Sequence, residues 1–300
     1  MESLFFQFLT SIVQYSKSVL RCLRSVFWYS KSIFQNLSSG CSAGIVLVYY
    51  YREKEEDMAK KAIVLHSGGL DSTVLLFHVL KNLGFDVSEV VTLSVYYGQR
   101  HARELKAAQE LNRILGVEHF EIQIPTEKIF STSALVDKSK ELPNQHYTHE
   151  NQKVTVVPNR NMILLSFAIA YAENIGAKFV YYAAHKNDYT IYPDCRPEFV
   201  EVIDKASQVG TYNQVNVCAP FVDLYKADIV SIGLKLDVPF ELTWSCYNGG
   251  EFPCSFKNTK SFEEVLGKGC ATCQERNEAF FVNKVVDPLY NKYLSTVSVL

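Results

Sequence analysis

Several features that would point to other classes of protein are missing from this chain of 300 residues. The net charge is −2 and no stretch is rich in Lys and Arg, which argues against direct contact with nucleic acid. The longest apolar run, residues 43–51, is far shorter than the ~20 residues that a membrane helix needs. No internal repeat or low-complexity linker divides the chain. With 48% hydrophobic residues, it is expected to be a globular enzyme that acts on small molecules.

Acidic side chains are scarce near the start, where residues 1–50 contain one acidic residue, Glu2, against four basic ones. This region also lacks the single apolar block and cleavage site of a signal peptide. Residues 54–56, Lys-Glu-Glu, are what a purine-rich ribosome-binding sequence encodes, and Met58 follows shortly after them. We therefore expect residues 1–57 to be a translated leader or disordered arm outside the fold. The alternative is a basic amphipathic arm that lies on a membrane surface.

A strand, a glycine turn and a helix start follow one another from residue 62. Residues 62–66 read as a short buried strand, Ser-Gly-Gly follows at 67–69, and residues 74–83 are typical of an apolar helix. The N–H groups of such a turn converge with the helix start to form an anion site. The order Ser-Gly-Gly-x-Asp-Ser lacks the lysine of a Walker loop. It resembles the pyrophosphate loop (PP-loop) of N-type ATP pyrophosphatases, which split ATP between its α and β phosphates.

Strands and helices alternate along the rest of the chain, which predicts an α/β fold with a doubly wound parallel sheet. Polar residues 125–153 are interpreted as a surface loop. We expect a nucleotide-binding domain over 58–240 and a zinc-binding C-terminal segment over 241–300. The further strands are expected at 88–96, 117–124, 178–183 and 215–218. The helices are expected at 102–115, 162–175, 197–208 and 225–236, the last being the final clear helix.

Ligands of such sheets bind beyond the carboxyl ends of the strands. The Ser-Gly-Gly turn follows the first strand, and Tyr-Gly-Gln-Arg-His at 97–101 follows the second. His-Lys-Asn-Asp at 185–188 follows the strand at 178–183. These polar segments, distant in sequence, are therefore expected to converge on one cleft.

Half of the eight cysteines lie in the last fifth of the chain. A chain with a nucleotide loop is expected to be cytoplasmic, so this cluster predicts a metal site rather than disulfides. Cys-x-x-Cys spacing suits two ligands of a tetrahedral zinc, and two more cysteines complete a closed structural site. A redox pair is the alternative for a lone Cys-x-x-Cys. The predicted ligands are Cys246, Cys254, Cys270 and Cys273.

Several motifs between residues 62 and 280 occur together in one enzyme family. They are Ser-Gly-Gly-Leu-Asp-Ser at 67–72, Tyr-Gly-Gln-Arg-His at 97–101, Val-Pro-Asn-Arg-Asn at 157–161, Ile-Tyr-Pro-Asp-Cys-Arg-Pro-Glu-Phe at 191–199, Thr-Trp-Ser-Cys at 243–246, and Cys273-x-x-Arg276-x-x-Ala279-Phe280. In these motifs the chain resembles the 7-cyano-7-deazaguanine synthases of the queuosine pathway.

The resemblance implies an adenine-nucleotide α-hydrolase-like fold and ATP-dependent conversion of 7-carboxy-7-deazaguanine and ammonia to 7-cyano-7-deazaguanine (preQ0). The intermediates would be an adenylated acid and an amide. It also implies Mg²⁺ with ATP, one structural Zn²⁺ and a possible homodimer. In the family the last three zinc cysteines are usually closely spaced, whereas here residues 255–269 separate two of them. We interpret 255–269 as an insertion with a helical turn at 262–266, which the zinc site can survive because loop closure costs little.

The resemblance also implies the residues that handle ATP. We expect the catalytic residues to be Ser67, Asp71, Ser72, Arg100 and Arg160. Asp71 would act through Mg²⁺, since a bare carboxylate repels phosphate; helix capping is its alternative role. The two arginines would hold phosphate or carboxylate oxygens, or else be ordinary surface residues. The expected ATP-binding stretch is Leu65, His66, Ser67, Gly68, Gly69, Leu70, Asp71, Ser72, Thr73, Val74 and Leu75.

The deazaguanine ring presents N–H donors, so its site needs a carboxylate acceptor. Asp188, Asp194 and Glu198 are the alternatives for that acceptor. Tyr192 and Phe199 would stack on the ring or else belong to the core. Arg196, in the same motif, completes the expected substrate contacts.

Two other functions remain open from sequence. A different PP-loop ATP pyrophosphatase, either a tRNA-thiolating enzyme or an amide synthetase, would need an RNA-binding module or an ammonia-producing partner, and neither is visible. A non-catalytic nucleotide- or zinc-binding scaffold is disfavoured by the intact loop.

Overall fold

The computed structural model describes residues 60–297, apart from 101–102, 126–128, 138 and 143–152. The chain divides into two units, Met1–Asp57 and Met58–Leu300. The expectation for residues 1–57 lies outside the described residues, and a boundary near residue 240 stays a prediction.

Five strands form one parallel sheet in the order β3-β2-β1-β4-β5. The chain proceeds from β1 outward to β3 and then crosses to β4 on the other side of β1, so a topological switch point lies between β1 and β4. The prediction of a doubly wound parallel sheet is confirmed. The strands are β1 (Ala62–Leu65), β2 (Val90–Tyr96), β3 (Glu118–Gln123), β4 (Phe179–Tyr181) and β5 (Asn216–Cys218).

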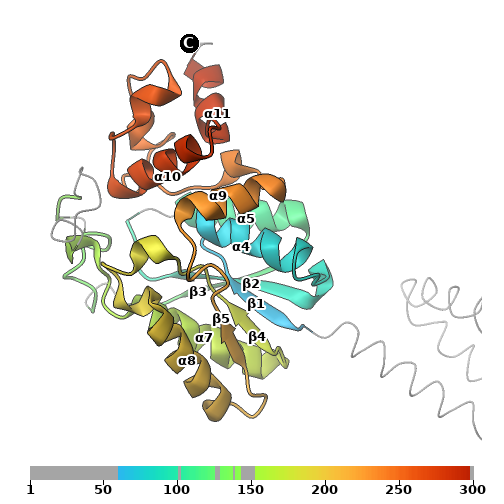
Figure 1. Ribbon diagram of the computed structural model, residues 1–300. Coiled ribbons are helices and arrows are strands. Elements are labelled where there is room, and N and C mark those ends of the chain that lie inside the picture. Colours follow the sequence, from blue (N-terminus) through green and yellow to red (C-terminus); the bar gives the residue numbers. More distant parts are fainter. Residues whose placement is uncertain (1–59, 101–102, 126–128, 138, 143–152, 298–300) are drawn as a thin grey trace, which may run out of the picture. The chain divides into compact units, whose positions relative to one another are not determined.

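Helices cover both faces of the sheet because alternate strand residues point to opposite sides (Figure 1). On the first face of the sheet, Ala62 and Val64 belong to the core that the helices cover. Ile63 belongs to the core on the opposite face. The first face carries α4 (Leu70–Lys81), α5 (Arg103–Leu115) and α9 (Lys226–Lys235). The second face carries α7 (Arg160–Ile175) and α8 (Pro197–Gly210).

Among the described residues, one helical segment, Lys153–Ile175, is long and apolar enough to cross a membrane by length and composition alone. Within the fold, its α7 portion packs against β1 and β4. Leu165, Ala168 and Ala172 are buried in that contact. One side of α7 therefore packs its apolar residues against the core of the sheet.

The expectation that the last helix ends near residue 236 is wrong. Two more helices follow, α10 (Ala271–Val282) and α11 (Pro288–Val297). The spacing of apolar residues does not predict helix α10, because its buried residues include Gln274, Glu275 and Arg276. Their burial depends on partners elsewhere in the chain, which a local period does not record.

Residues 125–153 differ in part from the polar surface loop that was predicted. Phe130, Leu135 and Leu142 are buried and pack with Val157 in a small separate core. The Arg100 guanidinium donates to the carbonyl oxygens of residues 137 and 140, which ties this segment to the end of β2. Residues 126–128, 138 and 143–152 lie outside the described part.

The segment inserted between Cys254 and Cys270 packs into the core on the first face of the sheet. Phe256, Phe262 and Val265 are buried in it, and the first two contact the Tyr290 ring of α11. A short 3-10 helix, Phe262–Val265, confirms the predicted helical turn. The insertion is thus a packed part of the C-terminal region.

A buried ion pair ties α10 to the start of α11. Arg276 is bound through Nε and Nη2 to Asp287 at 2.6 and 3.0 Å, and its Nη1 donates to Thr243 Oγ1 at 2.7 Å. Arg276→Ala should lower the free energy of unfolding by about 3–5 kcal/mol, because the Asp287 carboxylate would remain buried without a partner. Urea unfolding measures this. Arg276→Lys keeps the charge but loses the paired hydrogen bonds, so its free energy of unfolding should lie between those of the wild type and Arg276→Ala. Unchanged stability in both variants would contradict the stabilising role of this ion pair.

Candidate active site

The PP-loop turn runs in close contact with α5. Gly68 adopts φ +80°, and a Cβ atom there would overlap the Glu104 carbonyl oxygen and lie 2.5 Å from the Ala108 nitrogen. Only glycine suits both this backbone conformation and this distance of approach. The second residue of the Ser-Gly-Gly turn is therefore required by tertiary packing as well as by the turn.

Hydroxyl groups within the loop occupy two of its amides. The Ser67 N–H donates to Ser72 Oγ at 3.2 Å, and the Gly69 N–H donates to Ser67 Oγ at 3.2 Å. The Gly69 carbonyl accepts from the Thr73 hydroxyl at 2.7 Å and from the Thr73 N–H at 3.1 Å. These bonds hold the turn in shape and occupy the Gly69 carbonyl with donors from the start of α4.

A buried polar chain supports the loop from below. Asn112 Nδ2 lies 3.0 Å from His66 Nδ1, and His66 Nε2 lies 3.1 Å from Thr73 Oγ1. Because Asn112 donates to Nδ1, the network assigns the His66 proton to Nε2, which donates to Thr73. Burial, with a smaller effect from His119, lowers the pKa of His66 to about 3, so the ring stays neutral. His66 therefore positions the loop rather than carrying charge to the ligand.

A cavity of about 260 Å³ opens at the carboxyl ends of the strands. It is lined by residues that follow β1, β2 and β4, together with residues from α5, α7, α9 and the segment 244–247. The predicted convergence of the strand-end motifs is therefore found. The sequence-predicted residues on its wall are Leu65, His66, Ser67, Gly69, Leu70, Asp71, Ser72, Arg100, Arg160, Asp188, Tyr192 and, from the predicted metal ligands, Cys246.

Oppositely charged groups meet at one end of this cavity. Asp71 Oδ2 lies 3.3 Å from Lys226 Nζ and 3.7 Å from His185 Nε2. Lys226 also binds Glu275 Oε2 at 2.5 Å, and His185 Nε2 lies 3.4 Å from Asp188 Oδ2. Two cations are thus held at the base of the anion site, next to the PP-loop.

The protonation states of this cluster follow from their neighbours. Although burial alone would raise the pKa of Asp71, Lys226 and His185 lower it, so Asp71 is ionised. Burial alone would lower the pKa of His185, but Asp188 and Asp71 raise it to about 9. Burial likewise opposes the charge on Lys226, yet Asp71 and Glu275 raise its pKa. Lys226 and His185 therefore both carry positive charge at neutral pH.

Several buried polar atoms around the cavity have no partner within the described residues. They comprise one acceptor, Asp71 Oδ1, the two donors Arg100 Nε and Arg160 Nε, and the Tyr182 hydroxyl. Buried polar groups are rarely left unsatisfied in native proteins. These atoms are consistent with a ligand that offers anionic oxygens to the donors and a cation to Asp71.

The remaining predicted residues lie away from this cavity. Gly68 and Thr73 support the loop from behind, and Val74 and Leu75 are buried in the core. Asp194 Oδ2 accepts the Asn161 N–H at 2.8 Å, at the start of α7. Arg196 donates to the Tyr189 carbonyl at 2.8 Å, Glu198 is exposed on α8, and Phe199 packs against the core.

Sequence reasoning missed three side chains that the cavity brings together: Glu104, Tyr182 and Lys226. It placed residue 185 at the right sheet edge but assigned it no role. Lys226 begins α9 just after β5, so the strand-end rule applied to β5 could have found it. For Glu104 and Tyr182, the sequence gives no indication of a role in the site other than their positions next to the strand-end motifs.

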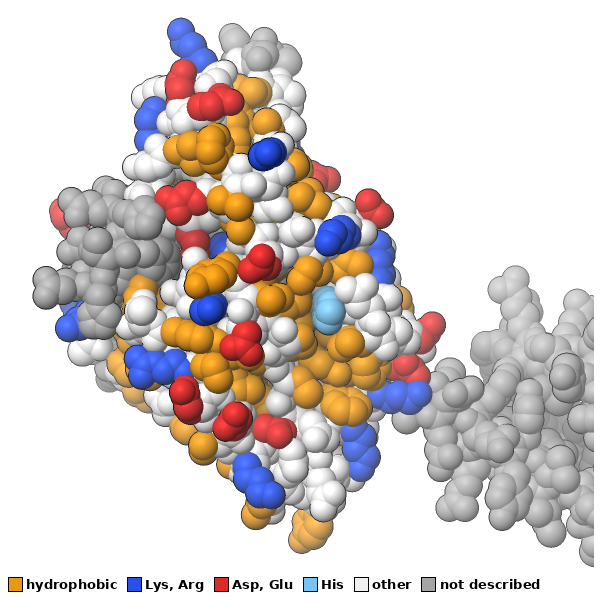
Figure 2. Space-filling view, in the orientation of Figure 1, with side chains coloured by type: hydrophobic (Ala, Val, Ile, Leu, Met, Phe, Trp, Pro, Cys, Tyr) orange, Lys and Arg blue, Asp and Glu red, His pale blue; other side chains and the backbone are white. Residues whose placement is uncertain are grey.

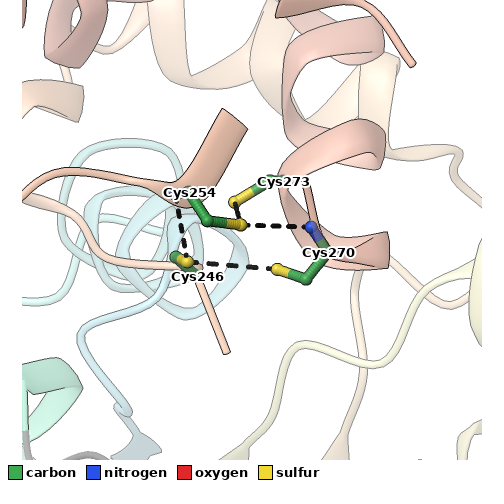
Figure 3. Close-up of side chains that lie close together, drawn as sticks. All are labelled: Cys246, Cys254, Cys270 and Cys273. Carbon is green, nitrogen blue, oxygen red and sulfur yellow. Dashed lines mark hydrogen bonds between the residues drawn. The ribbon is translucent and has the colours of Figure 1, made fainter. Parts of the chain in front are cut away.

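The four predicted metal ligands lie together (Figure 3). Their Sγ atoms all lie within 4.8 Å of one another, with Cys254–Cys273 at 3.8 Å and Cys246–Cys270 at 4.0 Å. A tetrahedral site with Zn–S bonds of ~2.3 Å has S–S edges of about 3.8 Å. The cluster therefore has the dimensions of a four-thiolate metal site, and Cys254 reaches it despite the insertion.

Groups around Cys254 favour its thiolate. Hydrogen bonding with the Cys246, Cys270 and Cys273 thiols lowers the pKa of Cys254. The Cys270 N–H donates to Cys254 Sγ at 3.1 Å. Gly269, at φ +86°, allows this approach, because a Cβ there would lie 3.0 Å from Cys254 Sγ. The residues fit a divalent metal such as zinc.

The cysteine cluster is joined to the PP-loop by the segment between them. The Trp244 N–H donates to the Gly68 carbonyl at 2.9 Å, and the Trp244 indole donates to the Cys246 carbonyl at 3.0 Å. The Arg103 guanidinium lies 4.1 Å from the centre of the Trp244 ring. Disturbance of the metal site should therefore reach the nucleotide loop.

Gly68→Ala should abolish turnover, because the Cβ would push the loop away from α5. The matched control is Gly116→Ala, since Gly116 also has a positive φ (+71°) but no atom lies within 4 Å of its added Cβ. The control should lose only about 1–2 kcal/mol of stability and keep its activity. Steady-state turnover and thermal melting of both variants test this. Equal activity in both would refute the close-approach argument.

The chain was then compared with known proteins. The family model described as queuosine biosynthesis protein QueC matches residues 61–284. The chain belongs to this family. Similar relatives are the 7-cyano-7-deazaguanine synthase of Archaeoglobus fulgidus, 48% identical over 76% of this chain and 89% of that one, and 7-cyano-7-deazaguanine synthase 1 of Colwellia psychrerythraea, 43% identical over 77% and 99%.

A third relative, the 7-cyano-7-deazaguanine synthase of Caldicellulosiruptor saccharolyticus, is 44% identical over 76% of this chain and 94% of that one. The match to the QueC family model extends from β1 to the end of α10, so it includes the PP-loop, the cavity and all four cysteines. The resemblance inferred from the motifs is thereby confirmed.

Proposed function

We propose that this member of the queuosine family makes 7-cyano-7-deazaguanine from 7-carboxy-7-deazaguanine, ammonia and ATP by way of an adenylated acid and an amide. The observation that carries the proposal is the cavity, where the PP-loop adjoins two cations and unpartnered arginine edges. A carboxylate resists attack by ammonia until one of its oxygens becomes part of a leaving group. Catalysis then consists mostly of positioning and charge stabilisation.

The PP-loop amides, Lys226 and His185 would hold the phosphates of ATP and the departing pyrophosphate. Ser67 and Ser72 would exchange their mutual hydrogen bonds for bonds to phosphate oxygens. Asp71 would hold Mg²⁺ through Oδ1, a buried oxygen without a partner among the described residues. Mg²⁺ supplies charge neutralisation on the phosphates when bound. The four cysteines would hold Zn²⁺ in a structural role.

Arg100 and Arg160 would hold substrate or phosphate oxygens through their free Nε–H edges. Among the alternatives for the ring acceptor, Asp188 is favoured because it lines the cavity. Asp194 is engaged at the start of α7, and Glu198 is exposed on α8. Tyr192 lies on the cavity wall with its hydroxyl 3.1 Å from Thr155 Oγ1, and it would contact the ring.

The test is product analysis by mass spectrometry after incubation of the full chain with the deazaguanine acid, ammonium and Mg-ATP. We expect the nitrile, AMP and pyrophosphate, with the amide appearing first. ADP as the nucleotide product would contradict the cleavage site. Absence of ATP–pyrophosphate exchange in the presence of the acid would favour a non-catalytic scaffold.

The partners and the location belong to the same proposal. On the face in Figure 2, basic and acidic side chains are interspersed, which supports small-molecule substrates rather than direct nucleic-acid binding. A possible homodimer stays a prediction from the family, and a cytoplasmic location stays a prediction from the nucleotide loop. Light scattering of the purified chain measures the oligomeric state.

A further inference from the structure

Each product bond of the proposed reaction requires the loss of protons from nitrogen. When ammonia attacks the acyl adenylate, a C–N bond forms, AMP leaves with the C–O electron pair, and the new nitrogen must release a proton. In the second round the amide oxygen bonds to the α-phosphorus of a second ATP, and pyrophosphate leaves as the bond between the α and β phosphates breaks. The amide nitrogen then loses two protons as the C–O bond breaks and the C≡N bond forms. The site therefore needs a group that accepts a proton beside the PP-loop.

Glu104 occupies a suitable place. It lies in the first turn of α5, it is one of the residues that line the cavity, and its carbonyl oxygen abuts Gly68 of the PP-loop. The groups that face its carboxyl are Asp71 of α4, Arg160 of α7 and Tyr247 of the segment after α9. The carboxyl thus lies between the nucleotide loop and an arginine proposed to hold the substrate.

We propose that Glu104 is the general base of this site, its carboxylate taking protons from the ammonia-derived nitrogen in both rounds. This inference rests on the proposed function. Each proton passes from nitrogen to a Glu104 carboxylate oxygen, and water removes it before the next transfer, so no oxidant or further reactant is needed.

The other groups around the cavity are poorly suited to the task. Lys226 and His185 are held protonated by their carboxylate neighbours, and burial raises the pKa of Tyr182 and Tyr247, which keeps both phenols neutral. The charges of Lys226 and His185 make Asp71 too weak a base. Burial raises the pKa of Glu104 to about 7, against a smaller opposing effect of Arg160. A base is most effective when its pKa lies near the working pH.

The experiment separates activation from proton transfer. Acid-dependent ATP–pyrophosphate exchange reports formation of the acyl adenylate, which removes no proton from nitrogen. Nitrile formation from supplied amide reports the second round without ammonia, whose own titration would confuse a pH profile. Both are measured in the wild type, in Glu104→Gln and in Glu110→Gln. Glu110 is an exposed glutamate on the same helix and outside this cavity.

We expect Glu104→Gln to keep acid-dependent exchange and to lose nitrile formation by on the order of 10²–10⁴-fold, while Glu110→Gln behaves as wild type. Because the pKa of Glu104 is raised, its basic form predominates only above about pH 7. Wild-type nitrile formation from the amide should therefore rise with pH through about 7, and that rise should be absent from Glu104→Gln. Glu104→Asp should recover part of the rate.

Three results would overturn the inference. The first is nitrile formation by Glu104→Gln at the wild-type rate. The second is loss of exchange and nitrile formation together in a folded Glu104→Gln, which would indicate a binding role. The third is a wild-type rate of nitrile formation that does not fall as the pH is lowered through about 7. This measurement does not depend on the folding of any variant. Absence of exchange in the wild type would instead refute the proposed function itself.

Discussion

Asp71→Asn should abolish nitrile formation, with turnover lowered on the order of 10³-fold. Its carboxylate lies 3.3 Å from Lys226 Nζ and 3.7 Å from His185 Nε2. Asparagine keeps the shape of the side chain but removes the charge that balances those two cations and would hold Mg²⁺. Phosphate positioning and charge neutralisation would fail together.

Turnover and ATP–pyrophosphate exchange measure the effect, and both should disappear, because Asp71 acts before the base does. Circular dichroism should show an unchanged fold, since Asp71 lies at the cavity rather than in the core. Asp237→Asn is the matched control, because Asp237 is exposed and its positive φ of 55° suits asparagine equally well. Retained exchange in Asp71→Asn would show that this carboxylate does not serve ATP.

Cys270→Ser should abolish metal binding by the four-cysteine cluster and unfold the C-terminal region. Cys270 is fully buried at the start of α10, and its N–H also donates to Cys254 Sγ. Apparent binding energies of structural zinc are about 10–16 kcal/mol in small zinc domains, so its loss exceeds what the surrounding contacts can replace. The packing of α10 and of residues 255–269 should be lost with it.

Metal content by mass spectrometry and the thermal melting temperature test this prediction. Removal of metal from the wild type by a chelator should reproduce the loss of stability and weaken ATP binding, because Trp244 joins Cys246 to Gly68. Cys218→Ser is the control, since Cys218 lies outside the cluster. Full metal occupancy with an unchanged melting temperature in Cys270→Ser would refute the four-thiolate site.

Features that depend on local chemistry were predictable from sequence. The Ser-Gly-Gly turn between a strand and a helix identified the PP-loop, because a glycine turn that opens a helix forms an anion site. Strand-end polarity placed residues 97–100 and 185–188 at one cavity. Cysteine spacing predicted the four residues of the thiol cluster, which could hold a metal, although only the fold brings Cys254 to its partners across residues 255–269.

Other features depend on which distant groups face each other, and tertiary structure alone decided them. Helix α10 was missed because its buried side is polar and paired, as Arg276 is with Asp287. The candidate base Glu104 has an ordinary sequence environment, and its raised pKa arises from burial in the cavity. Sequence by itself determined the family, the sheet and the nucleotide loop, since these follow from residue order and turn chemistry. The charge state of a side chain and its access to the cavity depend on desolvation and on groups that are distant in sequence. These surroundings exist only after the chain has folded.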